Sequence, residues 1–190
     1  MKKTSFIVLL TVLAVTGKLA AQSDSYTPWQ MSATVGFANP RGEGTKGGVS
    51  LYLEPMFHIN NHVSVGIRTG VALVGKAKLD AAGQPTDAFS VAGVFSYLAT
   101  GNYYFQFSPG AKFRPYAGIG MGFSKATGVA GTNAVSVDAS SGFGGMARMG
   151  FDLGHFCFNA EYALNPKTEK LSSNYFGINL GVYLGGGSQR

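Results

Sequence analysis

The chain has 190 residues, 15 of them Lys or Arg and nine Asp or Glu, a formal net charge of +6, with 28 glycines and only 13% charged residues. Its one cysteine, Cys157, excludes an internal disulfide. No segment beyond the N-terminus approaches the run of about 18 apolar residues that a transmembrane helix needs, which excludes a helical membrane protein.

The first predicted element is a secretory signal peptide over residues 1–21. Lys2 and Lys3 precede an uncharged run at 5–17, and small residues follow up to Ala21. That run is too short to cross a bilayer as a helix, so a retained anchor is the less favoured alternative. Cleavage after Ala21 removes three lysines and no acid, leaving 12 basic and nine acidic residues, a net charge of +3. No basic cluster remains to follow a phosphate backbone, so we expect no nucleic-acid partner.

The rest of the chain, residues 22–190, forms one domain with eight segments in which apolar and polar residues alternate. These predicted strands fall within about residues 29–186, at 29–37, 51–59, 63–73, 90–105, 114–123, 143–153, 156–164 and 176–184. Each has the length of about ten residues that a tilted strand needs to cross hydrocarbon. One face is apolar, and the other carries Gly, Tyr, Asn and isolated charges rather than the crowded Lys and Glu of a soluble sheet. The pattern indicates strands that face lipid on one side.

The connections alternate between short and long. Short turns are expected at 60–62, 106–111 and 154–155, and longer polar loops at 39–48, 75–89, 127–140 and 167–174. Short turns on one side, long loops on the other and an even strand number are typical of an outer-membrane barrel. We therefore predict an all-β fold, an eight-stranded antiparallel up-and-down transmembrane β-barrel, with both termini on the short-turn, periplasmic side.

Four charged residues interrupt the polar faces of two predicted hairpins. The three-residue turn after the second strand sets a register that puts Glu54 opposite Arg68, and the two-residue turn after the sixth puts Arg148 opposite Glu161. A lipid-facing Arg near the membrane midplane costs about 2–4 kcal/mol, so these residues belong in the lumen. We expect them to form two structural charge pairs in a lumen filled by side chains. A narrow, porin-like channel for small solutes is the alternative.

Other candidate sites are weak. The three histidines, His58, His62 and His155, fall near the periplasmic turns, the wrong end for chemistry on outer-leaflet lipid, and no nucleophile-elbow or zinc-protease motif is present. We expect no enzymatic activity, with an outer-membrane lipid hydrolase or acyltransferase as the rejected alternative. The glycine-rich run at 118–122 lies within a strand pattern, which favours barrel packing over nucleotide binding. Scattered histidines predict no metal and no cofactor.

Aromatic residues gather near both ends of the predicted strands, as in the two interfacial girdles of a membrane barrel. One group is Trp29, Phe57, Tyr103, Phe105, Phe113, Phe156 and Phe158, and the other is Phe37, Phe123, Phe143 and Phe176.

Two predicted strands carry recognisable motifs. The fourth is rich in tyrosine, with Tyr97-Leu98 followed by the run NYYF at 102–105, and the fifth contains the run RPYAGIG at 114–120. With them, the chain resembles the small outer-membrane β-barrel proteins, the OmpA-like and OmpX-like barrels, over roughly residues 25–186. The resemblance implies an integral protein of the outer membrane of a Gram-negative bacterium, in contact with outer-membrane lipid. Its role would be structural, or interaction with a surface partner through the outer loops. Because the chain ends six residues after Leu184, we expect the peptidoglycan-binding domain of full-length OmpA-type proteins to be absent.

Overall fold

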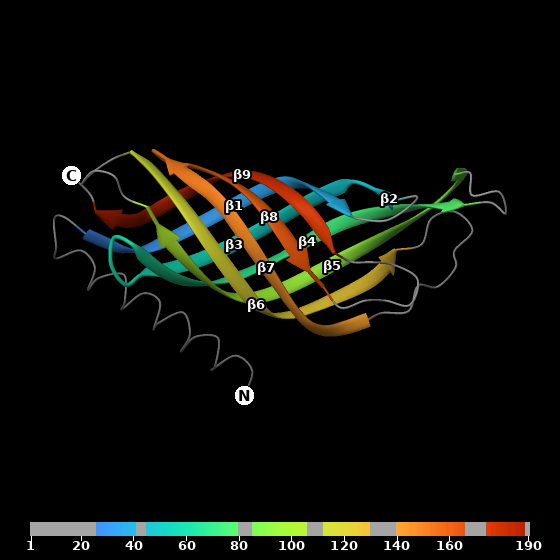
Figure 1. Ribbon diagram of the computed structural model, residues 1–190, viewed down its shortest axis with the longest axis horizontal. Helices are drawn as coiled ribbons and strands as arrows, with labels where there is room; N and C mark the ends of the chain where they lie inside the picture. Colours follow the sequence, from blue (N-terminus) through green and yellow to red (C-terminus); the bar gives the residue numbers. More distant parts are fainter. Residues whose placement is uncertain are drawn as a thin grey trace, which may run out of the picture.

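The computed structural model describes residues 26–40, 45–79, 85–105, 112–129, 140–165 and 174–188. The strands are β1 (Tyr26–Pro40), β2 (Thr45–Lys46), β3 (Gly48–His58), β4 (Val63–Leu79), β5 (Pro85–Tyr104), β6 (Phe113–Val129), β7 (Ser140–Leu153), β8 (Phe156–Leu164) and β9 (Tyr175–Ser188) (Figure 1). Within these ranges there is no helix that could span a membrane. The predicted signal peptide at 1–21 lies outside the described residues.

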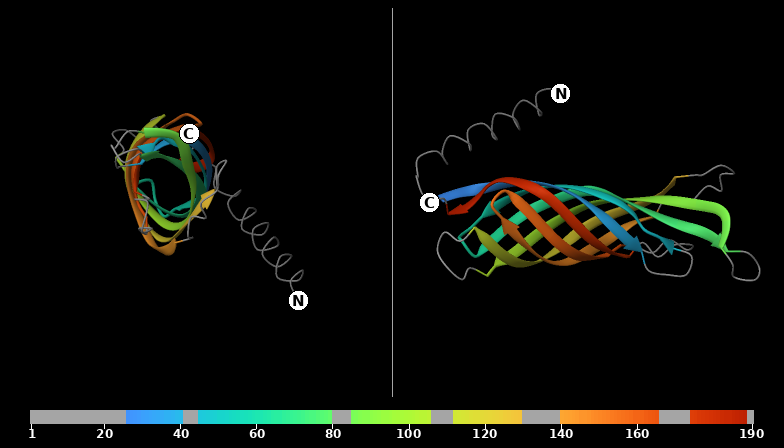
Figure 2. Two further views of the ribbon diagram at one scale, coloured as in Figure 1. Left: turned by 90° about the vertical axis from the view of Figure 1, so that its right-hand side faces the viewer. Right: turned by 90° about the horizontal axis from the view of Figure 1, so that it is seen from above.

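The eight long strands close into one antiparallel barrel. Each pairs with the next along the chain, and β1 pairs with β9 to complete the ring that Figure 2 shows end-on. The two-residue strand β2 also pairs with β4. It is not one of the eight strands that form the wall of the barrel. The start of β1 and the end of β9 lie at the end that carries the short turns (Figure 1). The predicted eight-stranded up-and-down barrel is confirmed.

Most strands run a few residues past the predicted bounds, and three run five or six residues further. β4 continues to Leu79, β5 begins at Pro85 and β6 continues to Val129, so parts of the predicted loops 75–89 and 127–140 are strand. Beyond the wall, β4 and β5 pair with each other as far as Leu79 and Pro85, and this extension projects past the other strands (Figure 1). Outside hydrocarbon, a strand does not need an apolar face, so the alternation that marks the other segments fades there.

The pairing register sets the width of the barrel. Partners followed sideways from Phe143 on β7 are Phe123, Tyr97, Thr69, Leu53, Ala33, Val182 and Phe156, and the path returns to β7 at Leu153, ten residues further along. For eight strands about 4.8 Å apart with a rise of about 3.3 Å per residue, this stagger gives a tilt of about 41° and a backbone radius of about 8 Å. A ring this narrow has room only for its own side chains.

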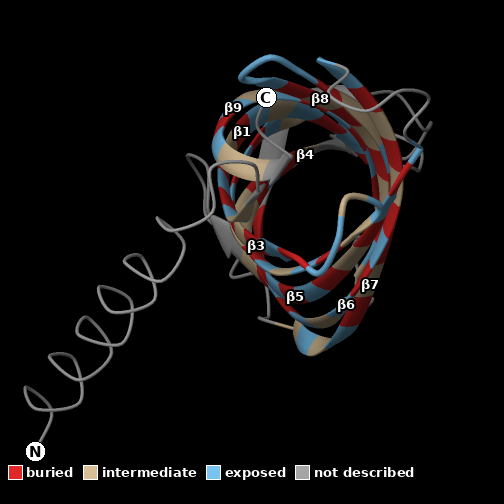
Figure 3. Cartoon of the chain, turned by 90° about the vertical axis from the view of Figure 1, so that its left-hand side faces the viewer, coloured by how far each residue is buried: buried red, intermediate tan, exposed pale blue. Residues whose placement is uncertain are grey.

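Where burial is described, residues along the long strands alternate between a buried inner face and an exposed outer face, as the colours of Figure 3 show. On β3, Tyr52 and Glu54 are buried, whereas Leu53 between them is 51% exposed. Elsewhere on the outer face, Ile67 is 62% and Ile119 is 63% exposed. A soluble monomer rarely exposes so continuous an apolar surface, so the outer face is built to contact lipid.

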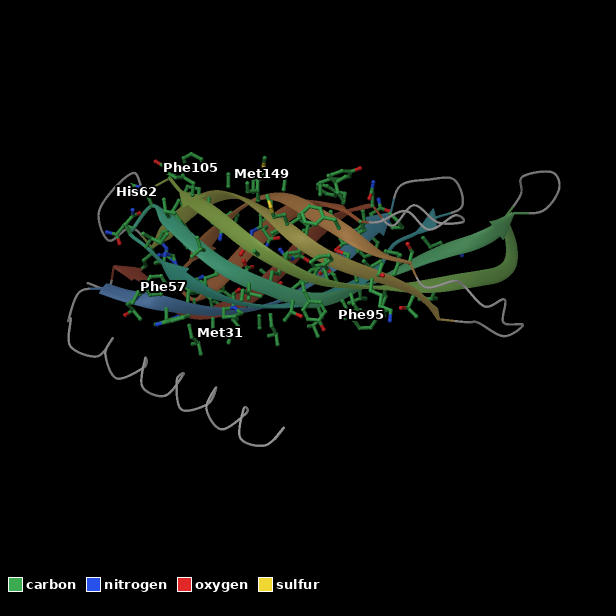
Figure 4. All side chains as sticks on the ribbon, turned by 90° about the horizontal axis from the view of Figure 1, so that it is seen from below. Met31, Phe57, His62, Phe95, Phe105 and Met149 are labelled. Atoms are coloured by element: carbon green, nitrogen blue, oxygen red, sulfur yellow. The ribbon has the colours of Figure 1, made fainter. Side chains whose placement is uncertain are left out.

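Aromatic side chains on the outer face gather at two levels. Near the short turns, Trp29 packs on Phe57 with ring centroids 5.2 Å apart, and near the long connections Phe123 packs on Phe143 at 6.2 Å. Phe113 and Phe123 are ten residues apart on β6, which corresponds to about 25 Å along the axis and matches the apolar band of such barrels. Figure 4 shows the outward Phe57 and Phe105 at one end and Phe95 toward the other. The aromatic residues therefore lie at the levels of the two predicted girdles.

A bulge ends the seam between β1 and β9. The register shifts between Thr27 and Gln30, and opposite them Gly185 and Gly186 have φ angles of +76° and +89°. A Cβ atom at Gly186 would overlap the Gln30 side chain, and one at Gly185 would overlap the Trp29 carbonyl oxygen. Both the backbone conformation and the close approach require glycine here.

Replacing Gly186 with Ala tests this bulge. We expect Gly186→Ala to lower the free energy of unfolding by about 2–3 kcal/mol, because a left-handed residue gains a Cβ that meets Gln30. Gly101→Ala is the matched control, since a Cβ there meets nothing within 4 Å, and its effect should be neutral or stabilising by about 0.5 kcal/mol. Urea unfolding in lipid vesicles, followed by heat-modifiable gel mobility, measures both. Equal stabilities of the two variants would contradict the account.

Candidate functional site: the charged lumen

Three buried ion pairs fill the lumen. The Arg68 Nη2 to Glu161 Oε2 and Arg148 Nη2 to Glu54 Oε1 distances are both 2.6 Å. Arg114 Nη2 lies 3.0 Å from Asp152 Oδ2. All six residues are at most 7% exposed. Every guanidinium and carboxylate in the described interior is therefore matched with an opposite charge.

The predicted lumen location of Glu54, Arg68, Arg148 and Glu161 agrees with this arrangement, but the predicted partners are wrong. The register is as expected, because Arg148 pairs with Glu161 across β7 and β8, and the β3–β4 register places Glu54 beside Arg68. The ionic contacts nevertheless cross the lumen, from Arg148 to Glu54 and from Arg68 to Glu161. In a barrel of about 8 Å radius, an Arg side chain extended toward the axis passes its strand neighbour and reaches the far wall.

The Glu54–Arg148 pair is fully hydrogen-bonded. Arg148 donates from Nη1 to Glu54 Oε2 and from Nη2 to Oε1, both at 2.6 Å, and from Nε to Asn102 Oδ1 at 3.1 Å. Thr100 Oγ1 donates to Glu54 Oε1 at 2.7 Å. The guanidinium also lies over the Tyr116 ring, 5.5 Å from its centroid. A forked, two-point contact with these supports holds both groups in one geometry.

The Arg68–Glu161 pair has fewer hydrogen bonds. Its 2.6 Å contact is ionic, without an N–H of Arg68 aligned on the Glu161 oxygen. The Arg68 guanidinium stacks 3.8 Å from the Tyr52 ring centroid and directs Nη1 at Met146 Sδ, 3.7 Å away. Tyr52 in turn shares a 2.5 Å hydroxyl contact with Tyr175. Stacking and coulombic attraction, more than directed hydrogen bonds, fix this second pair.

The third pair, Arg114–Asp152, was not predicted. The two residues are direct neighbours on β6 and β7 at the short-turn end, and Arg114 Nη1 also donates to the Gly186 carbonyl at 3.2 Å. Gln30 Oε1 lies 3.5 Å from Arg114 Nη2 and 2.8 Å from His58 Nε2. The long connection between β6 and β7 hides their register in the sequence. The remaining signal was that both residues lie on inner faces, near strand ends that share the short-turn side.

An apolar cluster occupies the opposite end of the lumen. It consists of Ala38, Ala72, Val74, Val94, Ala126, Ala163 and Tyr175, all at most 5% exposed. Two cavities of about 10 Å³ lie among the ion pairs, one lined by Glu54 and Arg148, and the other by Arg68 and Glu161 together with Ala163 and Tyr175 of the cluster. Each has room for about one water molecule. In the described lumen, the apolar cluster thus lies at the long-connection end, and the three ion pairs follow toward the short-turn end.

The three histidines lie at the short-turn end, as predicted. His58 is the last residue of β3, His62 lies in the turn before β4 and stacks 6.0 Å from Tyr103, and His155 lies in the turn before β8. In the ranges that the structure describes, no group of three His, Cys, Asp or Glu side chains could hold a metal.

Comparison with known proteins agrees with the geometry. A family model described as the outer membrane protein beta-barrel domain matches residues 6–183. No curated protein sequence matches the chain significantly. Among solved structures, the attachment invasion locus protein Ail of Yersinia pestis, in complex with the heparin analogue sucrose octasulfate, is 15% identical, with 82% of this chain and 99% of that chain covered and a TM-score of 0.50. Neisserial surface protein A is 15% identical, with coverage of 83% and 96% and a TM-score of 0.53. At this identity, the likeness concerns the fold.

Double-mutant cycles test which charges are partners. Glu54→Gln or Arg148→Gln alone should cost about 3–5 kcal/mol of unfolding free energy, because each leaves a buried charge without its partner. We expect a coupling energy of about 2 kcal/mol between Glu54 and Arg148, and less than half of that between Glu54 and Arg68. Urea unfolding of the single and double variants in vesicles supplies the values. A larger coupling for the Glu54–Arg68 cycle would reinstate the pairing within the hairpin.

Proposed function

The chain belongs to the outer membrane protein β-barrel domain family, and from that premise we propose that it is a closed, non-conducting barrel of the Gram-negative outer membrane. Its role is structural, or interaction with a surface partner through its long connections. The apolar outer face between two aromatic levels supports integral membership of that membrane.

The observation that carries the closed state is the series of barriers in the lumen. A solute would first meet the apolar cluster around Val74 and Val94, then the cross-lumen contacts of Arg68 and Arg148, and then Arg114. Separating one buried ion pair without replacement costs about 3–5 kcal/mol, and several barriers lie in series. A resting barrel with this interior does not pass ions.

The strand lengths support a role at the cell surface. β4 and β5 themselves run beyond the level of Phe123 and Phe143, away from the membrane. The Y. pestis neighbour is described as an attachment invasion locus protein and the neisserial neighbour as a surface protein. From these we take only the general role of surface contact for this chain.

A narrow channel is the second candidate, and one observation favours it. Glu54 and Arg68 are neighbours within one hairpin, and Arg148 and Glu161 within another. If each hairpin kept its own pair, the side chains would lie along the wall instead of across the lumen. The charges would then line a path rather than block it.

We also propose that the protein is not an enzyme and needs no cofactor. The histidines lie at the short-turn end, where outer-leaflet lipid is out of reach, and the acidic groups of the described lumen are engaged by arginines. A measured lipid hydrolase activity that depends on one of the histidines would contradict this proposal.

Single-channel recording tests the closed state. The chain from Gln22 onward, refolded into a planar bilayer, should show no steady openings, while heat-modifiable gel mobility demonstrates that it is folded. Steady openings whose conductance changes in Glu54→Gln would establish the channel and make the charged residues its selectivity filter. A matched recording of Lys112→Gln, which changes a charge outside the lumen, controls for effects of net charge.

A further inference from the structure

One lysine stands on the outer face just past the aromatic level near the long connections. Lys125 lies on β6, two residues beyond Phe123 on the same face, and its side chain is exposed. The three ion pairs of the described chain use Arg68, Arg114 and Arg148. Within the described ranges, Lys125 has no such counterion.

The neighbours of Lys125 combine a polar group with apolar rings. Its direct cross-strand partners are Phe95 on β5 and Ser141 on β7, both exposed. Toward the membrane, Phe123 and Phe143 are 70% and 67% exposed and meet edge to face. Phe95 points outward near the long-connection end of the barrel (Figure 4). The surface therefore offers an ammonium and a hydroxyl directly above an exposed aromatic wall.

The level of Lys125 matches a lipid head group. A second lysine, Lys112, immediately precedes the other end of β6, 13 residues before Lys125. At about 3.3 Å per residue and a tilt of about 41°, the two are about 32 Å apart along the axis, the thickness of the hydrocarbon core. Both residues thus lie at the levels where head groups begin, Lys125 on the side of the long connections.

We propose that Lys125, Ser141, Phe95, Phe123 and Phe143 bind a phosphate-bearing lipid of the outer leaflet. The lipid phosphate contacts the Lys125 ammonium and the Ser141 hydroxyl, and an acyl chain lies along the aromatic rings. The inference rests on the membrane location of the barrel but not on whether the lumen conducts. An amphiphile with an anionic head fits because the cation and the rings are stacked in that order along the membrane normal.

Native mass spectrometry of the mature chain in detergent, with phosphatidylglycerol or phosphatidylcholine added, tests the site. We expect phosphatidylglycerol to be retained preferentially, and Lys125→Gln to lower its retention about fivefold, the effect of one basic residue at an anionic surface. Lys125→Arg should keep it. Lys112→Gln is the matched control, because Lys112 is an exposed lysine at the opposite end of β6 from Lys125 and Ser141. The Lys112→Gln variant should retain phosphatidylglycerol to within about twofold of the parent chain, because Lys125 and its neighbours are unchanged in it.

Two further measurements separate the lipid from other sources of the effect. Phe95→Ala should weaken retention while leaving the charge intact, because it removes the apolar contact for the chain. Inorganic phosphate at millimolar concentration should not displace the lipid. Unchanged retention in Lys125→Gln, an equal loss in Lys112→Gln, or displacement by free phosphate would each overturn the proposal. Conductance recordings are unaffected by any of these results, so failure of this inference is distinguishable from failure of the closed-barrel proposal.

Discussion

The stagger of the strands is the constraint on which the rest of the molecule depends. A shift of ten residues around eight strands sets both the tilt and a backbone radius of about 8 Å. At that width, inward side chains from opposite walls meet, so their sizes and charges must be complementary across the lumen. The cross-lumen contacts of Arg68 and Arg148, and the glycine at 186 that yields space to Gln30, are consequences of this one dimension.

The Glu54–Arg148 and Arg68–Glu161 pairs are held in place by different kinds of contact. Glu54 and Arg148 form a forked contact with Asn102 and Thr100 completing the hydrogen bonding. Arg68 instead relies on an aromatic face and a thioether. The desolvation cost of a buried ion pair is offset only when its remaining donors and acceptors are satisfied, so the first pair is the better candidate for a net stabilising contact. The second is the more readily rearranged.

Much of the fold could be predicted because contact with lipid requires an apolar residue at every second position of each strand. Where lipid ends, the pattern ends, and the extension of β4 and β5 up to Leu79 and Pro85 was therefore missed. Short turns fixed the register within the β3–β4 and β7–β8 hairpins. Ion-pair partners depend on which walls face each other after closure, a non-local property, so Glu54 was matched with the wrong arginine. Arg114 and Asp152 are neighbours across a long connection, whose register no local rule supplies.

The cross-lumen contacts also tie distant parts of the chain to one another. Glu54 and Arg68 belong to β3 and β4, and their counterions Arg148 and Glu161 belong to β7 and β8. Pairing within hairpins would have let each hairpin form its final ion pair alone. The observed contacts instead form only when β3 and β4 face β7 and β8 across one lumen. The native ion pairs are therefore a property of the closed barrel, and they stabilise closure rather than any single hairpin.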